Sequence, residues 1–502
     1  MNSAPAEKKL NEARQCLQQH HFSQAMSAYE KLTQQFPHKA WIWFEYGCAA
    51  GGAGLLDQVE RTWRKALELE PNNSELLLQM GHRYQALRLP QKARASFERA
   101  AVLDPRGINP RMALAILLEQ NHRFAESREA VASCLAIDPR DDQARYFAAL
   151  LDRRENKLEA AERGLRDLIA SGPRHPYVMY ASRYELAEAL NRTDRFDEAM
   201  AALAEAKKLV RSCGDVDTML KEYDVEAGKY RRSTQELPTN ILRTWAKDFP
   251  EKSREAIPRL AFLGGHPRSG TTLLEQILGA HPEVAALDEP GAFTGIAAAM
   301  FNASPQLLPA RLNVIRRLYI AAVQRELGGQ AEGKLILDKN PSPTLKLRIW
   351  LRLFPELRVI IALRDPRDVV ISCYFQNIPL NPFNANFLSL ERTATHYANL
   401  MDVWLAVRQW EGFAWIETRY EDIVADLAKE GRRVTEFAGL TWHEEQGRFH
   451  EKSAKKQMYS PTYHDATQPV YARSVSRWRA YEKYLAPCQP ILERYCRALG
   501  YV

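Results

Sequence analysis

The first half of the chain repeats one pattern of large and small side chains every 34 residues. Proline marks the period, recurring at Pro37, Pro71, Pro105, Pro139 and Pro173. Eight residues before each proline stands a large apolar residue, in turn Tyr29, Trp63, Phe97, Val131 and Leu165. Twelve residues before it stands a smaller residue, in turn Ala25, Val59, Ala93, Ser127 and Ala161. Because both positions fall on one stripe of a helix, the pattern predicts paired helices with a proline after each second helix.

A period of 34 residues is typical of the tetratricopeptide unit, in which two helices are joined by a turn. One unit cannot bury its apolar face alone, so neighbouring units stack into a solenoid. A further unit, RFDEAMAALAEAKKL at 195–209, keeps the pattern after a four-residue insertion. We therefore predict an all-α tetratricopeptide array over 1–212 and a helical linker over 213–258. The repeat positions are core, and by analogy of fold the groove is expected to bind a peptide or protein partner.

The second half alternates short apolar runs with amphipathic stretches. Strands are expected at 261–265, 335–338, 356–363 and 413–420. Helices are expected after them, at 271–281, 344–354, 367–376 and 421–430. Strands that alternate with helices predict a central parallel sheet with covered faces. Residues 259–502 are thus expected to form an α/β domain like that of phosphate-loop proteins, with ligands at the carboxyl ends of the strands.

Composition narrows the choice of partners and compartment. A chain of 502 residues is long enough for two or three domains, and its net charge of +7 suits an anionic ligand without the dense basic face of a nucleic-acid binder. The seven cysteines are scattered and never form CxxC, which argues against a zinc site or a disulfide framework and favours a reducing compartment. The start of the chain lacks the apolar core of a signal peptide, and no run of about 18 apolar residues predicts a membrane span. A cytoplasmic protein is expected, and the oligomeric state stays open.

The segment GGHPRSGTT at 264–272 resembles a phosphate-binding loop without its lysine. The usual pattern is G-x-x-x-x-G-K-[ST]. Gly265, Gly270 and Thr272 keep the spacing, but Thr271 stands at the lysine position and Arg268 lies inside the loop. Backbone N–H groups and the start of a helix favour an anion, and an arginine adds a planar fork of donors. An ATP or GTP site would also need magnesium ligands and usually the lysine, and neither is evident.

Two segments carry a resemblance to a known family. HPRSGTTLLEQILGAHPEVAALDEP resembles the 5′-phosphosulfate-binding segment of sulfotransferases, in particular of the tyrosylprotein sulfotransferase type, and ALRDPRDVVISCYF resembles that family's 3′-phosphate segment. The resemblance covers about 260–486 and implies the donor 3′-phosphoadenosine-5′-phosphosulfate (PAPS), in-line sulfonate transfer to a hydroxyl or amine, and no required metal. PAPS has no β- and γ-phosphates, so a loop lysine that reaches them would have nothing to hold.

The resemblance also implies roles for residues around the donor. The 5′-phosphate contacts would be made by Arg268, Ser269, Gly270, Thr271 and Thr272. Arg364 and Ser372 match the arginine and serine of the 3′-phosphate motif, and a fork of donors with a hydroxyl suits a phosphate. Gln376 stands where the family carries a basic residue, so one phosphate contact is expected to be weaker or to come from elsewhere.

The reacting groups follow from the same resemblance. Glu289 in LDEP matches the glutamate that accepts the proton of the acceptor hydroxyl, and Lys339 in LDKNP matches the lysine that stabilises the leaving phosphate. Arg268 would neutralise charge near the bridging oxygen. The family has threonine and arginine after its glutamate, whereas Pro290 and Gly291 follow here, which puts the lining of the acceptor side in doubt.

Further contacts are expected near the adenine and the nucleotide. Tyr420 matches a tyrosine near the adenine, although a buried core tyrosine is the alternative. Arg477 in SVSRW matches a late basic residue, and 462–471 would close over the nucleotide with Thr462 as a hydroxyl donor. Some soluble sulfotransferases use a catalytic histidine, but neither His266 nor His281 is expected to act in this way.

Two other functions stay open on sequence grounds. The chain could be a tetratricopeptide partner-binding protein whose second half is a non-catalytic nucleotide sensor, although the intact set of site residues argues against decay. It could also be a P-loop kinase, against which the missing lysine argues. The acceptor hydroxyl could belong to a tyrosine, a sugar, a lipid or a small metabolite. The array and the resemblance favour a peptide or protein tyrosine as the acceptor. The protein-tyrosine enzymes of this resemblance are membrane-anchored and luminal, and because no membrane span is predicted here, a bacterial cytoplasm is the expected setting instead.

Overall fold

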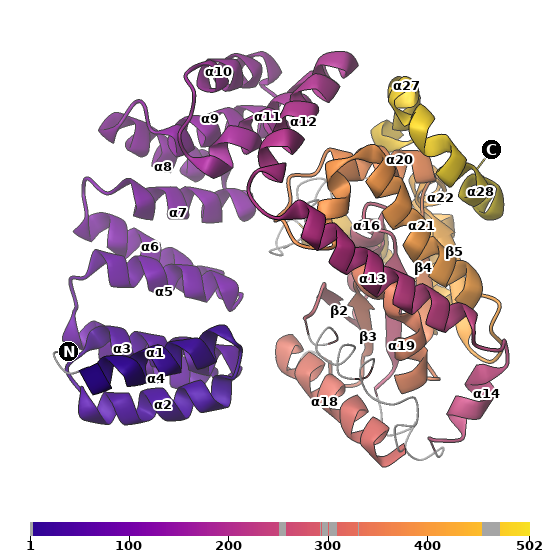
Figure 1. Cartoon of the computed structure of the whole chain (residues 1–502), viewed down its shortest axis with the longest axis horizontal. Coiled ribbons are helices and arrows are strands. Elements are labelled where there is room, and N and C mark those ends of the chain that lie inside the picture. Colours follow the sequence, from indigo (N-terminus) through magenta and orange to yellow (C-terminus); the bar gives the residue numbers. More distant parts are fainter. Residues whose placement is uncertain are drawn as a thin grey trace. The chain divides into compact units, whose positions relative to one another are not determined.

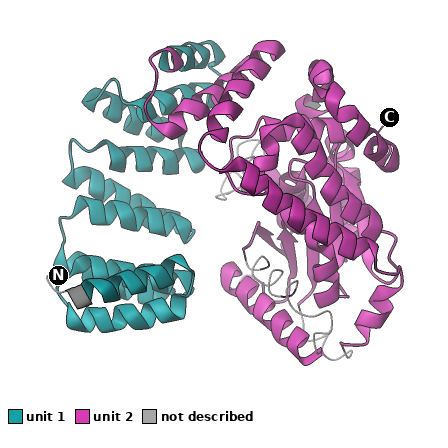
Figure 2. Cartoon of the chain, viewed as in Figure 1, with its two compact units in different colours: residues 1–168 teal, residues 169–502 magenta. Residues whose placement is uncertain are grey.

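The computed structural model describes residues 4–249, 258–291, 293, 300, 309–329, 331–453 and 472–501. Contacts between residues group the chain into two compact units, residues 1–168 and 169–502 (Figure 2). The repeat pattern predicts an array that reaches residue 212, whereas the contacts group 169–212 with the second unit. The extent of the array as a domain therefore stays a prediction from the period.

The first unit is a series of antiparallel helix pairs, as the period predicts (Figure 1). Most helices that follow one another along the chain pack on one another, and helices two positions apart, such as α3 and α5, also make contact. In order they are α1 (Ala4–Gln18), α2 (Phe22–Gln35), α3 (Ala40–Gly52), α4 (Leu56–Leu69), α5 (Ser74–Ala86), α6 (Pro90–Leu103), α7 (Ile108–Gln120), α8 (Phe124–Ile137), α9 (Asp142–Arg154) and α10 (Leu158–Ala170), the last of which runs across the boundary.

The turn inside each helix pair contains one residue in the left-handed conformation, with φ between 58° and 74°. These residues recur every 34 positions, at His20, Gly54, Arg88, His122 and Asn156. Asp194 has φ 58° in the turn of the next pair, four positions late, which matches the insertion seen in the sequence. The backbone thus repeats with the same period as the side chains.

In two of the helix pairs, a large side chain of the second helix packs on a glycine of the first helix. A Cβ atom on Gly47 would lie 2.1 Å from Nε1 of Trp63, and one on Gly81 would lie 2.3 Å from the ring of Phe97. The Trp63 indole N–H donates to the carbonyl of Phe44 at 3.0 Å, so its polar atom is satisfied inside the core. Close approach of two helices explains the alternation of large and small positions.

The second unit has at its centre a sheet that, in the described part of the chain, consists of five parallel strands. They are β1 (Leu260–Gly265), β2 (Val284–Asp288), β3 (Leu335–Lys339), β4 (Arg358–Leu363) and β5 (Ala414–Arg419), and they lie in the order β2-β3-β1-β4-β5. The sequence predicts four of them and misses β2. Parallel pairing puts all carboxyl ends on one edge, where Lys339 of β3 lies opposite both Leu263 of β1 and Asp288 of β2.

Helices cover both faces of this sheet (Figure 1). Helices α16 (Thr271–Gly279), α22 (Tyr420–Ala425), α23 (Leu427–Phe437) and α25 (Phe449–Ser453) join the core on one face. On the other face the Phe262 ring of β1 packs on Trp350 of α19 (Leu347–Leu353), which also contacts Tyr319 of α18 (Pro309–Leu327). The expected helix at 344–354 begins as a 3₁₀ turn, η1 (Ser342–Lys346), and Tyr420 begins α22 instead of closing a strand.

The other elements of the second unit surround this sheet. They are α11 (Pro176–Arg192), α12 (Phe196–Arg211), α13 (Val216–Gln235), α14 (Ile241–Ala246), α20 (Pro366–Tyr374), η2 (Asn384–Leu388), α21 (Leu390–Val407), α24 (Glu444–Gly447), η3 (Ala472–Ser474), η4 (Arg477–Tyr481), α27 (Glu482–Leu485), η5 (Ala486–Cys488) and α28 (Gln489–Leu499). Helix α13 packs against α21, so the described part of the predicted linker belongs to this unit. All seven cysteines are free thiols. Within the described ranges, no helix has both the length and the apolar character that crossing a membrane requires.

Gly81 and Gly164 form a matched pair of helix positions in the first unit. A Cβ atom on Gly164 would meet only the Cβ of Ala149, at 3.5 Å, whereas one on Gly81 would overlap Phe97. Since alanine favours a helix by about 1 kcal/mol over glycine, Gly164→Ala should raise the free energy of unfolding by about 0.5–1 kcal/mol. Gly81→Ala should lower it by about 1–3 kcal/mol through overpacking. Urea unfolding followed by circular dichroism measures both, and a gain for both variants would contradict the packing described.

Asp338 makes the stability of the second unit depend on pH. Its Oδ2 accepts a hydrogen bond from the Tyr319 hydroxyl at 2.6 Å, and burial raises its pKa from 3.8 to about 7. Between these values the folded chain keeps a proton that the unfolded chain releases, so this stabilisation is complete below about pH 4 and is lost as the pH rises through 7.

Asparagine cannot ionise but can still accept the tyrosine hydrogen bond. Asp338→Asn should therefore gain stability relative to wild type as the pH rises from about 5 to 8, by an amount on the order of a few kcal/mol. The measurement is the free energy of unfolding in urea of both proteins at both pH values. An identical pH dependence in the two proteins would mean that Asp338 titrates normally.

Candidate functional site

The carboxyl edge of the sheet gathers the residues that the sequence assigns to chemistry. The loop 266–270 follows β1, Glu289 follows β2, Lys339 ends β3 and Arg364 follows β4. These positions are far apart along the chain, and the parallel strands bring them to one edge because each strand ends there. The site is therefore a consequence of the sheet topology.

The backbone of the loop after β1 takes a conformation that requires glycine at two positions. Gly265 has φ 129°, and a Cβ atom there would lie 2.3 Å from the carbonyl oxygen of Ala362. The Thr344 hydroxyl fixes this point, since it accepts from Gly265 N–H at 2.8 Å and donates to Gly265 C=O at 2.9 Å. Gly270 is the N-cap of α16 with φ 90°, and a Cβ atom there would lie 2.8 Å from the Tyr420 ring.

The start of α16 offers donors to an anion. The first N–H groups of a helix have no acceptor within the helix, and its dipole favours negative charge there. Gly270 brings no side chain that caps this end. The predicted contacts Ser269, Thr271 and Thr272 are all buried at this point, with exposed fractions below a tenth. The structure thus places these residues together at the start of a helix, and phosphate binding there stays a prediction.

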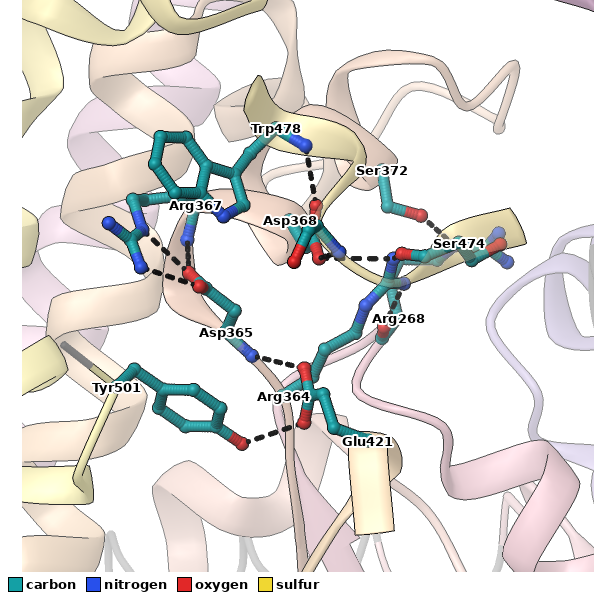
Figure 3. A network of polar contacts seen from close by, with 11 residues as sticks. Arg268, Arg364, Asp365, Arg367, Asp368, Ser372, Glu421, Ser474, Trp478 and Tyr501 are labelled. Atoms are coloured by element: carbon teal, nitrogen blue, oxygen red, sulfur yellow. Dashed lines mark hydrogen bonds and ion pairs between the residues drawn. The ribbon is translucent and has the colours of Figure 1, made fainter. Parts of the chain in front are cut away.

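Two arginines, one from the loop and one from the segment after β4, lie close together (Figure 3). Arg268, with φ 72°, donates from Nε to the Ser372 hydroxyl at 3.0 Å. Arg364 donates from Nη1 to the carbonyl of Arg268 at 3.2 Å and from Nη2 to the carbonyl of Ser474. Its guanidinium also lies 4.9 Å from the centre of the Tyr420 ring. Arg268, Arg364, Ser372 and Tyr420 are therefore brought together, as the sequence predicts.

Asp368 attaches the C-terminal segment to this cluster (Figure 3). Its carboxylate accepts hydrogen bonds from the backbone N–H groups of Ser476 at 2.8 Å and Trp478 at 2.7 Å. Burial raises the pKa of Asp368 to about 6, while Arg364, 3.9 Å away, acts in the opposite direction. Because Arg477 lies between Ser476 and Trp478 in the sequence, these two hydrogen bonds fix the backbone on both sides of it.

The Arg477 side chain lies on an aromatic platform. Its guanidinium carbon is 4.1 Å from the centre of the Phe375 ring, and Phe375 directly follows α20. Its Nε and Nη2 atoms are buried without a hydrogen-bond partner, and so is Nε of Arg364. Buried donors of this kind are costly unless an acceptor fills the site.

Lys339 lies between two carboxylates at the ends of β2 and β3. Its ammonium is 2.5 Å from Oδ1 of Asp288 and 3.0 Å from Oε1 of Glu289, and the lysine side chain is fully buried. Burial lowers the pKa of Lys339, but the nearby carboxylates, Asp288 foremost, outweigh it and raise the pKa to about 12. Lys339 therefore stays charged near neutral pH.

The two carboxylates differ in access to solvent. Asp288 is 6% exposed, whereas Glu289 is 45% exposed and can be reached by an acceptor molecule. Glu289 has φ 52°, and its N–H donates to the carbonyl of Lys339 at 2.8 Å. A left-handed backbone at a non-glycine residue costs energy and is common at functional sites. Glu289 thus has the exposure that a proton acceptor needs, and Asp288 does not.

Both histidines near the site have structural contacts. His266 is fully buried, its Nε2 is 2.8 Å from Nδ1 of His396, and burial lowers its pKa to about 4. His281 uses both ring nitrogens, one 2.9 Å from the Thr441 carbonyl and the other accepting from Glu283 N–H. Neither ring is placed to accept a proton from an acceptor hydroxyl.

Other expectations have mixed outcomes. Thr462 and the closing segment 462–471 lie outside the described residues. Gln376, which stands where the family carries a basic residue, donates a hydrogen bond from its side-chain amide to the Ser372 carbonyl at 3.2 Å.

The sequence gives no signal for the roles of Asp368 and Thr344, because their hydrogen-bond partners are 79 to 110 residues away along the chain. Among the described residues, no group of three or more His, Cys, Asp or Glu side chains is arranged to hold a metal ion. That the reaction requires no metal stays a prediction.

Comparisons with known proteins identify the second half. Residues 261–444 match the model of the sulfotransferase family, so this part of the chain is a sulfotransferase domain. Protein-tyrosine sulfotransferase A of Caenorhabditis elegans is 28% identical over 199 residues, which are 36% of this chain and 50% of that protein. An "Uncharacterized protein" of Aquifex aeolicus (strain VF5) is 25% identical over 463 residues, 88% of this chain and 57% of the relative. The chain thus spans about half the length of the curated relatives it matches.

Two solved structures resemble part of this chain. The sulfotransferase domain of the Synechococcus PCC 7002 olefin synthase covers 48% of this chain and 95% of that chain, with 20% identity and a TM-score of 0.35. The crystal structure of MamA covers 33% of this chain and 95% of that chain, with 21% identity and a TM-score of 0.28.

Removing the charge of Lys339 should destabilise the sheet edge. Lys339→Met leaves the buried Asp288 carboxylate without its cation, which is expected to cost about 3–5 kcal/mol of unfolding free energy. Lys346→Met is the control, since its partner Glu226 is half exposed and stays solvated when the lysine charge is lost, so the cost should be clearly smaller. Urea unfolding at neutral pH measures both variants. Equal losses would mean that Lys339 is not a buried, paired charge.

Proposed function

We propose that the sulfotransferase domain transfers a sulfonate group from PAPS to an acceptor hydroxyl, with a peptide or protein tyrosine as the acceptor class. The observation that carries the proposal is the gathering of Arg268, Arg364, Ser372 and Arg477 around a phosphate loop that lacks a lysine. A donor with one phosphate at each of two ribose positions and a terminal sulfonate needs such a distribution of donors.

The residues present fit the 3′-phosphate of this donor. The buried Nε and Nη2 of Arg477 and Nε of Arg364 have no hydrogen-bond partner, and phosphate oxygens would satisfy them. Ser372 adds a hydroxyl that now accepts from Arg268, so this hydroxyl and guanidinium are already oriented toward each other. Gln376 brings no charge at this point, and Arg477 supplies the additional cation.

The loop fits the 5′ end. Gly270 and the first turn of α16 would hold the 5′-phosphate with backbone N–H groups and the hydroxyls of Thr271 and Thr272. Tyr420, which covers Gly270 and contacts Arg364, would lie near the adenine. Thr462 would complete the nucleotide contacts from outside the described residues.

The chemistry of transfer falls to three side chains. When bound, PAPS supplies an activated sulfonate whose leaving group is a phosphate oxygen. Glu289 accepts the proton of the acceptor hydroxyl as the new S–O bond forms, and its open position allows the acceptor to approach. Lys339 stays protonated and offsets the negative charge that appears when the old S–O bond breaks, with Arg268 assisting on the loop side. Lys339 also fixes the Glu289 carboxylate by the 3.0 Å contact.

The acceptor class rests on likeness and on the repeat array. Several relatives are named protein-tyrosine sulfotransferases, at 24% to 28% identity over part of this chain. A helical repeat array presents a concave surface that suits a peptide, so the array would bind a protein partner or the acceptor protein itself. A cytoplasmic location stays a prediction from the sequence.

The proposal predicts that binding and transfer can be separated by mutation. Glu289→Ala should bind 3′,5′-adenosine bisphosphate, the product of PAPS, as tightly as wild type, but transfer should fall about 10²- to 10⁴-fold because the proton acceptor is lost. Arg364→Ala should weaken bisphosphate binding at least about tenfold through loss of a charge-assisted phosphate contact. Calorimetry measures binding, and release of bisphosphate from PAPS in the presence of tyrosine-containing peptides measures transfer.

ATP provides the control for the donor. Wild-type protein incubated with ATP and the same peptides should release no ADP, whereas release of ADP would favour the kinase alternative. Equal loss of bisphosphate binding in Glu289→Ala and Arg364→Ala would overturn the assignment of the base. Binding of the bisphosphate without turnover of PAPS on any tyrosine, sugar or phenol acceptor would favour a nucleotide sensor.

A further inference from the structure

The hairpin formed by α11 and α12 contacts the segment that carries Arg477, and both lie in the second unit. The Tyr481 hydroxyl, at the end of η4, donates to Oδ1 of Asn191 in α11 at 2.7 Å. The Tyr481 ring also meets Phe196, the first residue of α12, edge to face with 5.4 Å between ring centres. Tyr481 is fully buried, so these contacts are shielded from water.

Lys207 links the hairpin to α20, the helix that carries Ser372. Lys207 of α12 lies between the rings of Tyr184 in α11 and Tyr374 in α20, at 4.9 Å and 4.8 Å from their centres. Helix α20 also carries Ser372, which belongs to the 3′-phosphate motif. The hairpin thus contacts both segments that would surround the 3′-phosphate.

The outer contact of the hairpin is weaker. Asp197 is 2.7 Å from the Lys483 ammonium and accepts from the Tyr484 hydroxyl at 2.8 Å. Both charged side chains are more than half exposed, and exposed ion pairs contribute little to stability. Tyr481 is therefore the principal link between the hairpin and η4, and Tyr484 offers a matched control.

Tyr481 contacts Arg477 directly. The Arg477 guanidinium is 5.7 Å from the centre of the Tyr481 ring and 4.1 Å from that of Phe375, and the two rings are 5.5 Å apart. Burial raises the pKa of Tyr481 to about 12, although Arg477 acts to lower it, so the hydroxyl stays protonated and donates to Asn191. The Arg477 guanidinium thus lies against two rings, that of Phe375, which follows α20, and that of Tyr481, which contacts the hairpin.

We propose that Tyr481 is a positioning residue, through which Asn191 and Phe196 of the hairpin hold Arg477 in the orientation that receives the donor nucleotide. This inference rests on the proposed function. It makes the last helix pair of the repeat pattern a part of the donor site. A cation fixed in advance loses less freedom on binding, which improves affinity.

The test removes the hydroxyl and keeps the ring. Tyr481→Phe should weaken binding of 3′,5′-adenosine bisphosphate about fivefold in calorimetry, because an Arg477 side chain that is held less firmly loses more freedom on binding. The KM for PAPS should rise by the same factor, with a smaller effect on kcat. Asn191→Ala, which removes the same bond from the hairpin side, should give the same loss, and combining both changes should add nothing further. Tyr484→Phe, which also loses a hydroxyl contact with the hairpin, should bind as wild type does.

A second cycle separates positioning from a general weakening of the fold. In an Arg477→Ala background, Tyr481→Phe should have no further effect on bisphosphate affinity, because the residue it positions is absent. Two results would overturn the inference and leave the proposed function standing. One is a Tyr481→Phe variant whose bisphosphate affinity lies within about twofold of wild type, and the other is a Tyr481→Phe change that lowers this affinity by the same factor in the Arg477→Ala background. A wild-type protein that binds no bisphosphate would overturn the proposed function itself.

Discussion

A fully buried lysine at the end of a central strand requires compensating charge, and this requirement organises the sheet edge. Lys339 meets it with Asp288 and Glu289 at the end of the neighbouring strand, so β2 and β3 are joined by charge as well as by their backbone ladder. The same pairing fixes one exposed carboxylate at the place where the strands end. In this way one electrostatic constraint supplies structural stability and, in the proposed reaction, a charged group for the leaving phosphate and a held proton acceptor.

The rest of the site answers the opposite requirement, which is to hold negative charge. Backbone N–H groups at Gly270 and the start of α16 act together with guanidinium groups that come from the loop, from the end of β4 and from η4. Several of these donors are buried without an acceptor, which is a cost that a bound phosphate would offset. The carboxylate Asp368 keeps the distant C-terminal segment at the site by accepting two backbone hydrogen bonds.

Local patterns predicted much of this arrangement. The 34-residue period predicted the helix pairs, including the pair displaced by the four-residue insertion before Phe196, and the family resemblance of two segments predicted that Arg268, Arg364 and Ser372 belong to one site. Strand β2 was missed because its sequence, VAALD, contains two alanines, and alanine is depleted in strands. The contacts of Asp368 and Tyr481 were missed because they join residues 108 to 290 positions apart, which no local pattern encodes. For the same reason, the period assigned α11 and α12 to the array and gave no sign that their side chains also pack against α20 and η4.

The central claim is that arginines and loop amides at the carboxyl edge of the sheet bind the nucleotide of a sulfonate donor. A crystal structure of the full chain with 3′,5′-adenosine bisphosphate tests it most directly. The account predicts the 5′-phosphate on the backbone of 265–272 and the 3′-phosphate within hydrogen-bond distance of Arg364, Ser372 and Arg477. A nucleotide bound anywhere else, or the 3′-phosphate turned away from these side chains, would contradict it.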